Sequence, residues 1–578
     1  MYRKLFYASL IFSLLLSQKA YCQQNVYRIS FTDKNHTTYS LSSPAAYLSP
    51  RSIARRTAQG IAIDSTDIPV NQVYIDSVLH LTGGIFYESS RWLNFCVILL
   101  KDADTANIHN LNGRSFISDV ALVGVYCMDV AHRSSGNTSN TQPPAAAGKP
   151  TSLDGTYYSG AWNQIQLVNG NYLHDNGFDG SGKLIAVLDA GFPAVNTHPL
   201  FDSMWANNRF VDGYNFTYHS SDVFNYDIHG TQVLSTMAGY IPGTFVGTAP
   251  NALYALYITE NEIQNLDDQP GELCNMIAGA ERADSVGADV ITSSLGYDVF
   301  LSTCNNQSFP QPFTSLDGKT TIAAKAANMA TMKGILFVAS AGNDGAPAIG
   351  GWGTHILTPG DADSALTIGA TNYESYTPAA FSGYGPNAAG RVKPDVCAMG
   401  QSVTICNTSY SLPTSPSLTS ADDGTSFSTP QIAGLAACLW EAFPYATPYQ
   451  IKQAIIRCAS SYSNPGPQIG YGVPDFSCTQ QALSVKSTPS PFTSANWVIA
   501  DPNPFGSDLR LSVSPLQEGN VDFYLTDIAG KKVFSSQVYF YKGYNAPYTI
   551  SMPDLIPGIY LLKVVSSSQQ QVIKLIKN

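Results

Sequence analysis

Apolar positions change their spacing from one region of this chain to the next. Residues 184–188 form a short continuous apolar run, as in a buried strand, whereas residues 432–440 form a longer apolar stretch that fits a buried helix. Beyond residue 497, short β-type runs follow one another with Gly, Pro and Asp signals between them. The 578-residue chain is therefore predicted to hold several domains.

The N-terminus has the features of a secretory signal peptide over residues 1–22. Arg3 and Lys4 precede an apolar run at residues 5–16, and Ala20 and Cys22 are small residues near a cleavage point. This run is too short to span a membrane, and no later segment has the length of a transmembrane helix. We therefore expect an exported protein with no membrane span.

Residues 23–133 are predicted to form a small α+β domain. Strand-like patterns occur at residues 26–32 and 92–100, and helical patterns at residues 54–58 and 71–81. The polar, Pro-rich segment at residues 134–150 is typical of a flexible linker.

The C-terminal region is predicted to be a β-sandwich. A Ser-, Thr- and Pro-rich linker at residues 485–496 precedes it. Several short strands at close spacing favour a sandwich. We expect them at residues 509–513, 521–526, 532–538, 559–565 and 572–576.

Ser426 stands where the buried helix is predicted to begin, in the run GTSFSTP at residues 424–430. The free N–H groups and the dipole of a helix N-terminus favour negative charge. A serine nucleophile needs such surroundings, because its attack creates an oxyanion. Gly, Thr and Ser are also ordinary capping residues, so the turn alone assigns no function.

Two upstream segments supply partners for this serine. Asp189 ends the apolar run at residues 184–188, and His229 is followed by Gly230, Thr231 and a helical pattern. Alone, the aspartate could be a turn former and the histidine a structural residue. Together, Asp189, His229 and Ser426 follow the chain order of subtilisin-type triads, and the G-x-S-x-G elbow of α/β-hydrolases is absent from the sequence.

These segments resemble the sequence blocks of the subtilisin-like serine proteases, the subtilases. DAG at residues 189–191, HGT at 229–231 and GTSFSTP at 424–430 match the three blocks that carry the family's triad. Further matches are ASAGND at 339–344, VITSSLG at 290–296, FSGYG at 381–385 and KPDV at 393–396. The resemblance covers roughly residues 155–484 and implies an α/β domain with a mostly parallel sheet between helices.

The resemblance also implies roles for individual residues. Asn343 would complete the oxyanion hole, and Ser294, Leu295 and Gly296 would bind an extended substrate mainly through their backbone. Ala190 departs from the family, which usually has Ser or Thr beside the catalytic aspartate; activity is expected to survive. Extra length between the triad residues suggests surface insertions at residues 260–275 and 298–320.

The flanking domains carry resemblances of their own. The stretches SPRSIARR and SSRWLN, within residues 23–133, are similar to propeptides of bacterial subtilases, although a binding domain is the alternative. NPF, YLTDIAGKKV, LIPGIYLLKV and VIKLIKN, within residues 497–578, resemble a type IX secretion sorting domain; the alternative is a carbohydrate- or protein-binding sandwich. The expected order is signal peptide 1–22, propeptide 23–133, linker 134–150, peptidase domain 151–484, linker 485–496 and sorting domain 497–578.

Net charge and the distribution of basic residues limit the classes of partner that the protein is expected to bind. A net charge of −11 and the lack of a basic run argue against nucleic acid or an anionic membrane as the main partner. Protein or peptide substrates and the outer-membrane secretion machinery are expected instead, for a monomer exported through the periplasm to the surface or the medium. No cofactor is required; structural Ca²⁺ is compatible with the family, but no Asp-rich loop identifies ligands.

Two questions stay open at the level of sequence. Cysteine pairing is not fixed by spacing, and three pairs are conceivable: Cys397 with Cys406, Cys274 with Cys304, and Cys458 with Cys478.

The function expected is that of a secreted serine endopeptidase working through an acyl-enzyme; the alternative is a catalytically inactive surface binding protein on the same scaffold.

Overall fold

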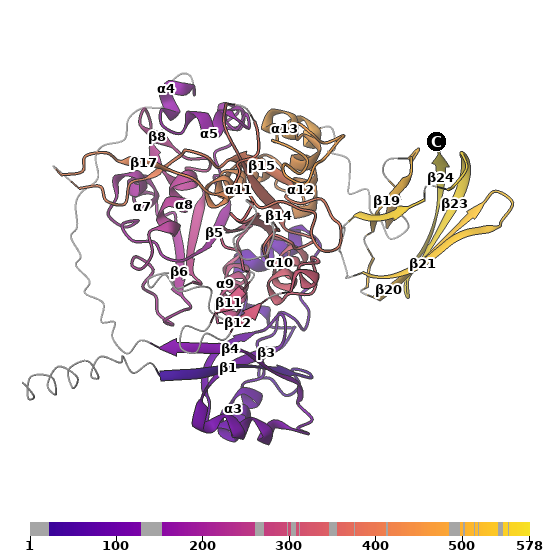
Figure 1. The fold of residues 1–578 in the computed structure, drawn as a ribbon, viewed down its shortest axis with the longest axis horizontal. Helices are drawn as coiled ribbons and strands as arrows, with labels where there is room; N and C mark the ends of the chain where they lie inside the picture. The colour runs from indigo at the N-terminus through magenta and orange to yellow at the C-terminus, as the bar shows by residue number, and fades with distance from the viewer. Residues whose placement is uncertain are drawn as a thin grey trace, which may run out of the picture.

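The chain forms three bodies in the computed structural model: a small N-terminal domain, a large middle domain and a C-terminal domain of strands (Figure 1). The predicted signal peptide lies outside the described residues except for Cys22, and both predicted linkers lie outside them. The residues described are 22–128, 153–260, 271–297, 299–301, 308–310, 312–345, 355–374, 376–411, 414–484, 497–500, 503–513, 515–517, 519–540, 547–552 and 554–578.

A parallel sheet forms the centre of the middle domain. Its first strand in the sequence, β5 (Leu184–Asp189), lies inside the sheet, and later strands lie on both sides of it. The direction in which the chain adds strands therefore changes next to β5. Every neighbouring pair is parallel. In the described residues the order is β15 (Val396–Met399), β14 (Leu366–Thr371), β13 (Leu336–Ser340), β10 (Val290–Ser293), β5 (Leu184–Asp189), β9 (Leu253–Ile258), β6 (Phe210–Asn215).

Helices cover both faces of this sheet (Figure 1). Side chains of β5 alternate between two cores, because successive residues of a strand point to opposite faces. Ile185 and Val187 belong to one core, and Ala186 and Leu188 to the other. The first core includes residues of α8 (His229–Ala238) and α11 (Thr425–Ala442), and the second those of α9 (Glu272–Val286) and α10 (Ile322–Met332). This confirms the predicted parallel sheet between helices.

Shorter elements complete the middle domain. A two-stranded hairpin lies in the predicted insertion at residues 298–320, whereas residues 261–270 of the other predicted insertion lie outside the described residues. The remaining elements are α4 (Gly155–Tyr158), α5 (Trp162–Gln166), α6 (Asn171–Asp175), η3 (Pro199–Phe201), α7 (Asp202–Ala206), β7 (Tyr240–Ile241), β8 (Phe245–Val246), β11 (Val299–Leu301), β12 (Ser308–Pro310), η4 (Phe313–Ser315), β16 (Val403–Cys406), β17 (Thr419–Asp422), α12 (Pro448–Arg457) and α13 (Phe476–Ser484).

The N-terminal domain is an antiparallel sheet with helices, as the α+β prediction required. The predicted strands and helices are present, whereas β2 and β4 had not been predicted. In described residues the sheet order is β2 (Ile85–Ser90), β3 (Phe95–Lys101), β1 (Cys22–Phe31), β4 (Ile117–Met128). The accompanying helices are η1 (Pro44–Ala46), α2 (Pro50–Ala58), α3 (Gln72–Thr82) and η2 (Asp102–Leu111).

One face of this sheet packs on the middle domain. Val26, Val97 and Leu99 share a core with residues of α9 and α10, whereas Ile29 and Ile98 point to the opposite face, toward α3. The N-terminal domain therefore lies against the helical face formed by α9 (Figure 1).

A cluster of buried charges joins the two domains. Asp284 of α9 is fully buried and forms ion pairs with Arg55, Arg56 and Arg91 of the N-terminal domain. The distances from its carboxylate oxygens to the guanidinium nitrogens are 2.5, 2.7 and 2.8 Å, respectively. We call these four residues the arginine clamp. Although burial alone would raise it, the three guanidinium groups hold the pKa of Asp284 below its usual range. Removing Asp284 would deprive three buried guanidinium groups of a shared partner, whereas removing one arginine would leave Asp284 with two.

The C-terminal domain has the predicted sandwich of antiparallel strands. Two sheets enclose one apolar core, and all five predicted strands are present, whereas β18 and β22 had not been predicted. In the described residues, β18 (Val498–Ala500), β19 (Asp508–Val513) and β22 (Pro547–Ser551) form one sheet. The other contains β21 (Lys532–Phe540), β20 (Gly519–Asp527), β23 (Gly558–Val565) and β24 (Gln570–Lys577).

The structure selects among the cysteine pairs. Cys458 and Cys478 form a disulfide, which links the residue after α12 to α13. The pair Cys397 and Cys406 is wrong: both are free buried thiols, because β15 belongs to the central sheet and β16 pairs with β17 instead.

Two further points concern the remaining cysteine pair and the membrane. Cys274 is also a free buried thiol, and Cys304 lies outside the described residues. No helix in the part of the chain that the structure describes is long and apolar enough to cross a membrane.

Candidate active site

Asp189 and His229 meet at the carboxyl end of β5, a strand inside the central sheet. Asp189 is the last residue of β5, and His229 is the first residue of α8. His229 Nδ1 lies 2.7 Å from Asp189 Oδ1, and the aspartate is fully buried. A buried carboxylate can fix the tautomer of the ring and stabilise an imidazolium, because electrostatic interactions are stronger in low dielectric.

Local sequence explains why the histidine reaches this position. The Asp227 carboxylate accepts the backbone N–H of His229 at 2.8 Å and so satisfies a free donor at the start of α8. A Cβ atom at Gly230 would collide with the carbonyl oxygen of Gly191 and lie 2.9 Å from the Cβ of Asp189. Only glycine therefore allows the start of α8 to approach the end of β5 so closely.

Ser426 lies in the first turn of α11, where the sequence predicted it. Almost every residue of this helix is buried, so its N-terminus is held rigidly inside the domain. Ser426 Oγ donates to the backbone carbonyl of Ser294 at 3.2 Å, and the Ser294 hydroxyl donates to the backbone carbonyl of Ser426 at 2.9 Å. A hydroxyl hydrogen rotates freely, so this contact leaves the oxygen available to a base.

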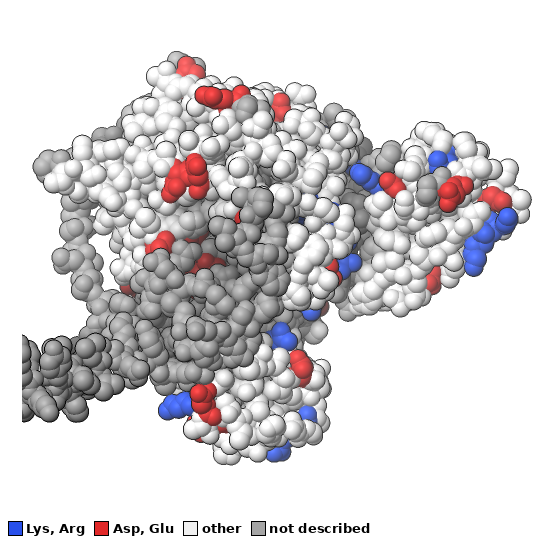
Figure 2. Space-filling view, in the orientation of Figure 1, with Lys and Arg blue, Asp and Glu red and all other residues white. Residues whose placement is uncertain are grey.

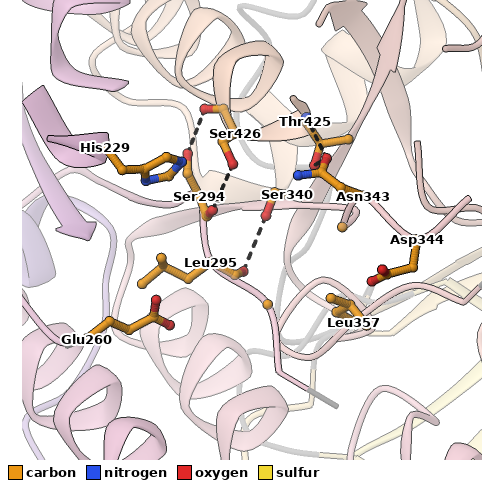
Figure 3. A pocket seen from close by; sticks show the side chains of 12 residues that line it. His229, Glu260, Ser294, Leu295, Ser340, Asn343, Asp344, Leu357, Thr425 and Ser426 are labelled. Carbon is orange, nitrogen blue, oxygen red and sulfur yellow. Dashed lines mark hydrogen bonds between the residues drawn. The ribbon is translucent and has the colours of Figure 1, made fainter. Parts of the chain in front are cut away.

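The side-chain amide of Asn343 has a defined orientation. Its Oδ1 accepts the backbone N–H of Thr425 at 3.0 Å and the hydroxyl of the same residue at 2.9 Å. A backbone N–H can only donate, so the oxygen of the amide must face Thr425. The amide nitrogen then points to the side of Ser426 (Figure 3), where it can donate to an oxyanion.

These groups surround one pocket of about 260 Å³ (Figure 3). It brings together His229, Ser426, Asn343 and all three predicted substrate-binding residues, which follow β10. Asp189 lies behind His229 and does not line the pocket. The lining residues are His229, Glu260, Ser294, Leu295, Gly296, Ser340, Gly342, Asn343, Asp344, Leu357, Thr425 and Ser426.

Sequence reasoning missed several of these lining residues. Glu260 stands two residues beyond β9, the neighbour of β5, and its place after a buried strand next to the triad strand was the available signal. Asp344 stood inside a recognised block, but only Asn343 had been given a role. Leu357 carried no signal in the sequence, because it belongs to none of the recognised blocks.

The departure at Ala190 has a visible counterpart in the structure. Asp189 Oδ1 accepts the backbone N–H of Ala190 at 2.8 Å. Asp189 Oδ2 is buried and has no hydrogen-bond partner in the part of the chain that the structure describes. Asp189 thus has an acceptor without a partner among the described residues, which is compatible with the absence of a hydroxyl at position 190.

Metal ligation is not assigned. Among the described residues, no group of three or more His, Cys, Asp or Glu is arranged to hold a metal ion. Ca²⁺ is also bound by backbone and amide carbonyls, so the structural Ca²⁺ that the sequence left open stays a prediction.

Three segments of the chain match models of known protein families. Residues 180–473 match the Subtilase family, and residues 26–140 match the Peptidase S8 propeptide domain of Bacteroidota. Residues 502–578 match the Secretion system C-terminal sorting domain.

Individual proteins resemble the middle of the chain. Subtilisin BL of Lederbergia lenta is 30% identical over 299 residues, which cover 51% of this chain and 90% of that protein. An alkaline protease of Alkalihalobacillus alcalophilus is 30% identical over 51% of this chain and 64% of its own length. Among solved structures, MycP1 with its N-terminal propeptide removed aligns with a TM-score of 0.41 and 23% identity over 55% of this chain and 96% of MycP1.

Proposed function

On the premise that this chain belongs to the subtilase family and is a serine endopeptidase, we propose that Asp189, His229 and Ser426 form its catalytic triad and that it works through an acyl-enzyme. Ser426 Oγ attacks the scissile carbonyl and forms an ester with the acyl half of the substrate. His229 takes the serine proton and gives it to the leaving amine, and Asp189 stabilises the imidazolium. A water molecule then attacks the ester. His229 takes a proton from this water and gives it to Ser426 Oγ as the acyl group leaves.

One observation carries this proposal. The 2.7 Å contact between His229 Nδ1 and Asp189 Oδ1 turns the other ring nitrogen away from the aspartate, and the ring lines the pocket that holds Ser426. Asn343 supports the same mechanism, because its amide nitrogen faces the Ser426 side of the pocket, where the oxyanion would form (Figure 3). Removing a donor of this kind costs about 10²–10³ in rate.

The flanking domains define how the enzyme is made and where it acts. The chain is a zymogen with an N-terminal propeptide, and its sorting domain makes it a secreted or cell-surface protein. We propose that it passes through the periplasm and that the outer-membrane secretion machinery recognises the C-terminal domain. The propeptide would inhibit the enzyme until it is cleaved off between the first two domains.

Substitution of the triad tests the function. Purified processed protein should hydrolyse casein, and Ser426→Ala or His229→Ala should reduce the rate by about 10⁵ or more. Ser428→Ala is the matched control, since Ser428 is a buried serine of the same helix that does not line the pocket. Wild-type protein without hydrolytic activity would favour the alternative, an inactive binding protein, for which the comparisons give no support.

A further inference from the structure

Two carboxylates line the pocket on different sides of Ser426. Glu260 lies on the side of His229, and Asp344 lies on the side of Asn343 (Figure 3). No Lys or Arg belongs to the lining residues that the structure describes. Among the described residues, the pocket lining thus carries two carboxylates and no permanently cationic side chain.

The carboxylate of Glu260 occupies a sheltered position. Its residue is only 6% exposed, and in Figure 3 its carboxylate points toward Leu295, part of the segment expected to lie beside the substrate. The Coulomb attraction between a carboxylate and a cationic side chain is stronger in such surroundings than at the surface, although both groups lose hydration when they pair there.

The surroundings of Asp344 combine an apolar wall with a charge. Gly296 and Gly342 both pack closely against Leu357, where Cβ atoms would lie 2.8 and 2.9 Å from its side chain. The side chain of Leu357 therefore forms a wall of the pocket, and Asp344 stands beside it (Figure 3). A lysine or arginine fits this arrangement, because its aliphatic stem packs on an apolar surface while its charged end reaches a carboxylate.

The geometry of an extended peptide lets one substrate meet both carboxylates. Side chains of a strand point alternately to opposite sides, so neighbouring residues of a peptide lying beside Ser294–Gly296 enter different parts of the pocket. The charge of the rest of the protein also favours cationic substrates. On the face in Figure 2, Asp and Glu are more prominent than Lys and Arg over the middle domain, and the net charge of the chain is −11.

We propose that Glu260 and Asp344 make this enzyme selective for peptides with lysine or arginine side chains next to the scissile bond. Asp344 would receive the side chain beside the Leu357 wall, and Glu260 a second cationic side chain on the His229 side. The proposal rests on the proposed function, because it assumes that peptides are cut at Ser426.

Matched peptides test this selectivity with the processed enzyme. Each series is identical except for Lys, Gln or Glu at one position, scanned from three residues before the scissile bond to one after it. We expect kcat/KM to favour Lys over Gln about tenfold at the position read by Glu260. At the position read by the exposed Asp344, about two- to fivefold is expected, and Glu should be the poorest residue at both.

Single substitutions assign each preference to its carboxylate. Glu260→Gln should abolish the Lys preference at one position and Asp344→Asn at the other, whereas Glu374→Gln, an exposed glutamate outside the pocket, should preserve both. If Glu260→Gln does not fold, the matched peptides cut by the wild-type enzyme still show whether Lys is preferred over Gln and Glu. Cleavage that requires Ser426 but prefers apolar or acidic residues at these positions would overturn the selectivity alone. Absence of any cleavage would overturn the proposed function with it.

Discussion

Ser294 and Ser426 exchange two hydrogen bonds across 132 positions of sequence. In a regular helix the carbonyl of residue 426 would accept the N–H of residue 430, but Pro430 has none. The hydroxyl of Ser294 donates to that carbonyl instead, and Ser426 Oγ donates to the Ser294 carbonyl. The proposed nucleophile is thereby tied to the segment expected to bind substrate, so the two should keep a fixed distance.

Ser294→Ala should therefore impair catalysis more than folding. The variant loses one buried hydrogen bond, worth about 1 kcal/mol of unfolding free energy. A small displacement of the nucleophile should lower kcat by about tenfold with little change in KM. Kinetics with a neutral peptide and urea unfolding measure the two effects.

A proline substitution provides the matched background for this test. Pro430→Ala restores an N–H that can donate to the Ser426 carbonyl, so Ser294→Ala should cost less in that background than in the wild type. Equal costs in both backgrounds would show that Ser294 does not act through this carbonyl.

The arginine clamp predicts which contacts hold the propeptide in place. Arg55→Ala would leave Asp284 with fewer cationic partners in a fully buried site. A buried charge left without any partner costs about 3–5 kcal/mol; because Asp284 keeps two arginines, the loss should be smaller, and inhibition of the processed enzyme by residues 23–133 added in trans should weaken about tenfold. Arg114→Ala is the control, since Arg114 is an exposed arginine of the same domain. A similar loss in both variants would exclude the clamp as the main contact.

The same interface predicts that the propeptide binds less tightly as the pH rises. Burial raises the pKa of Glu88 from 4.5 to about 7, and the nearby charge of Glu281 adds to the rise. The bound propeptide thus keeps a proton that the free one has lost between these values, and affinity should fall through this window by up to about tenfold per pH unit. Below it, Asp284 gains a proton and the clamp weakens, because the bound state holds its pKa low.

Inhibition constants measured from about pH 5 to about pH 7 follow this dependence. Glu88→Gln carries no titrating group at this position, so its inhibition constant should change little over the same range. A wild-type affinity that rises with pH would contradict the assignment to Glu88.

How much the sequence predicts depends on whether a feature is local. Asp189, His229 and Ser426 each sit in a short run whose neighbours fix their conformation, such as Gly230 after the histidine. The pattern of those runs therefore predicts both the elements and the site. The strands of the C-terminal domain were predicted for the same reason, since each is bounded by its own turn residues.

Features that arise between distant segments escaped prediction. Glu260 and Leu357 line the same pocket as Ser426, and the strands that precede them, β9 and β13, are brought together only through β5 and β10 between them in the sheet. The arginines of α2 had been noticed only as part of a recognised stretch, and nothing local indicates that Asp284 would receive them. The cysteine pair 397–406 failed likewise, because nearness in sequence says nothing about which sheet each strand joins.

Removal of the C-terminal domain should separate chemistry from export. The sandwich has its own apolar core, and all proposed catalytic groups precede residue 430. A chain truncated near residue 490 should fold and cut peptides when its propeptide is present, but in the native host it should accumulate in the periplasm. Fractionation with an activity assay of each compartment checks this. Normal extracellular activity would refute the sorting role, and loss of purified activity would indicate a stabilising module.

The identity of the nucleophile is the central claim, and a covalent label tests it most directly. The processed protein is incubated with a fluorophosphonate, which reacts with an activated serine, and the adduct is located by mass spectrometry of its peptides. The account predicts one adduct on Ser426, lost in Ser426→Ala and strongly reduced in His229→Ala, with Ser428→Ala labelled like the wild type. An adduct on another residue, or labelling that persists without Ser426, would contradict it.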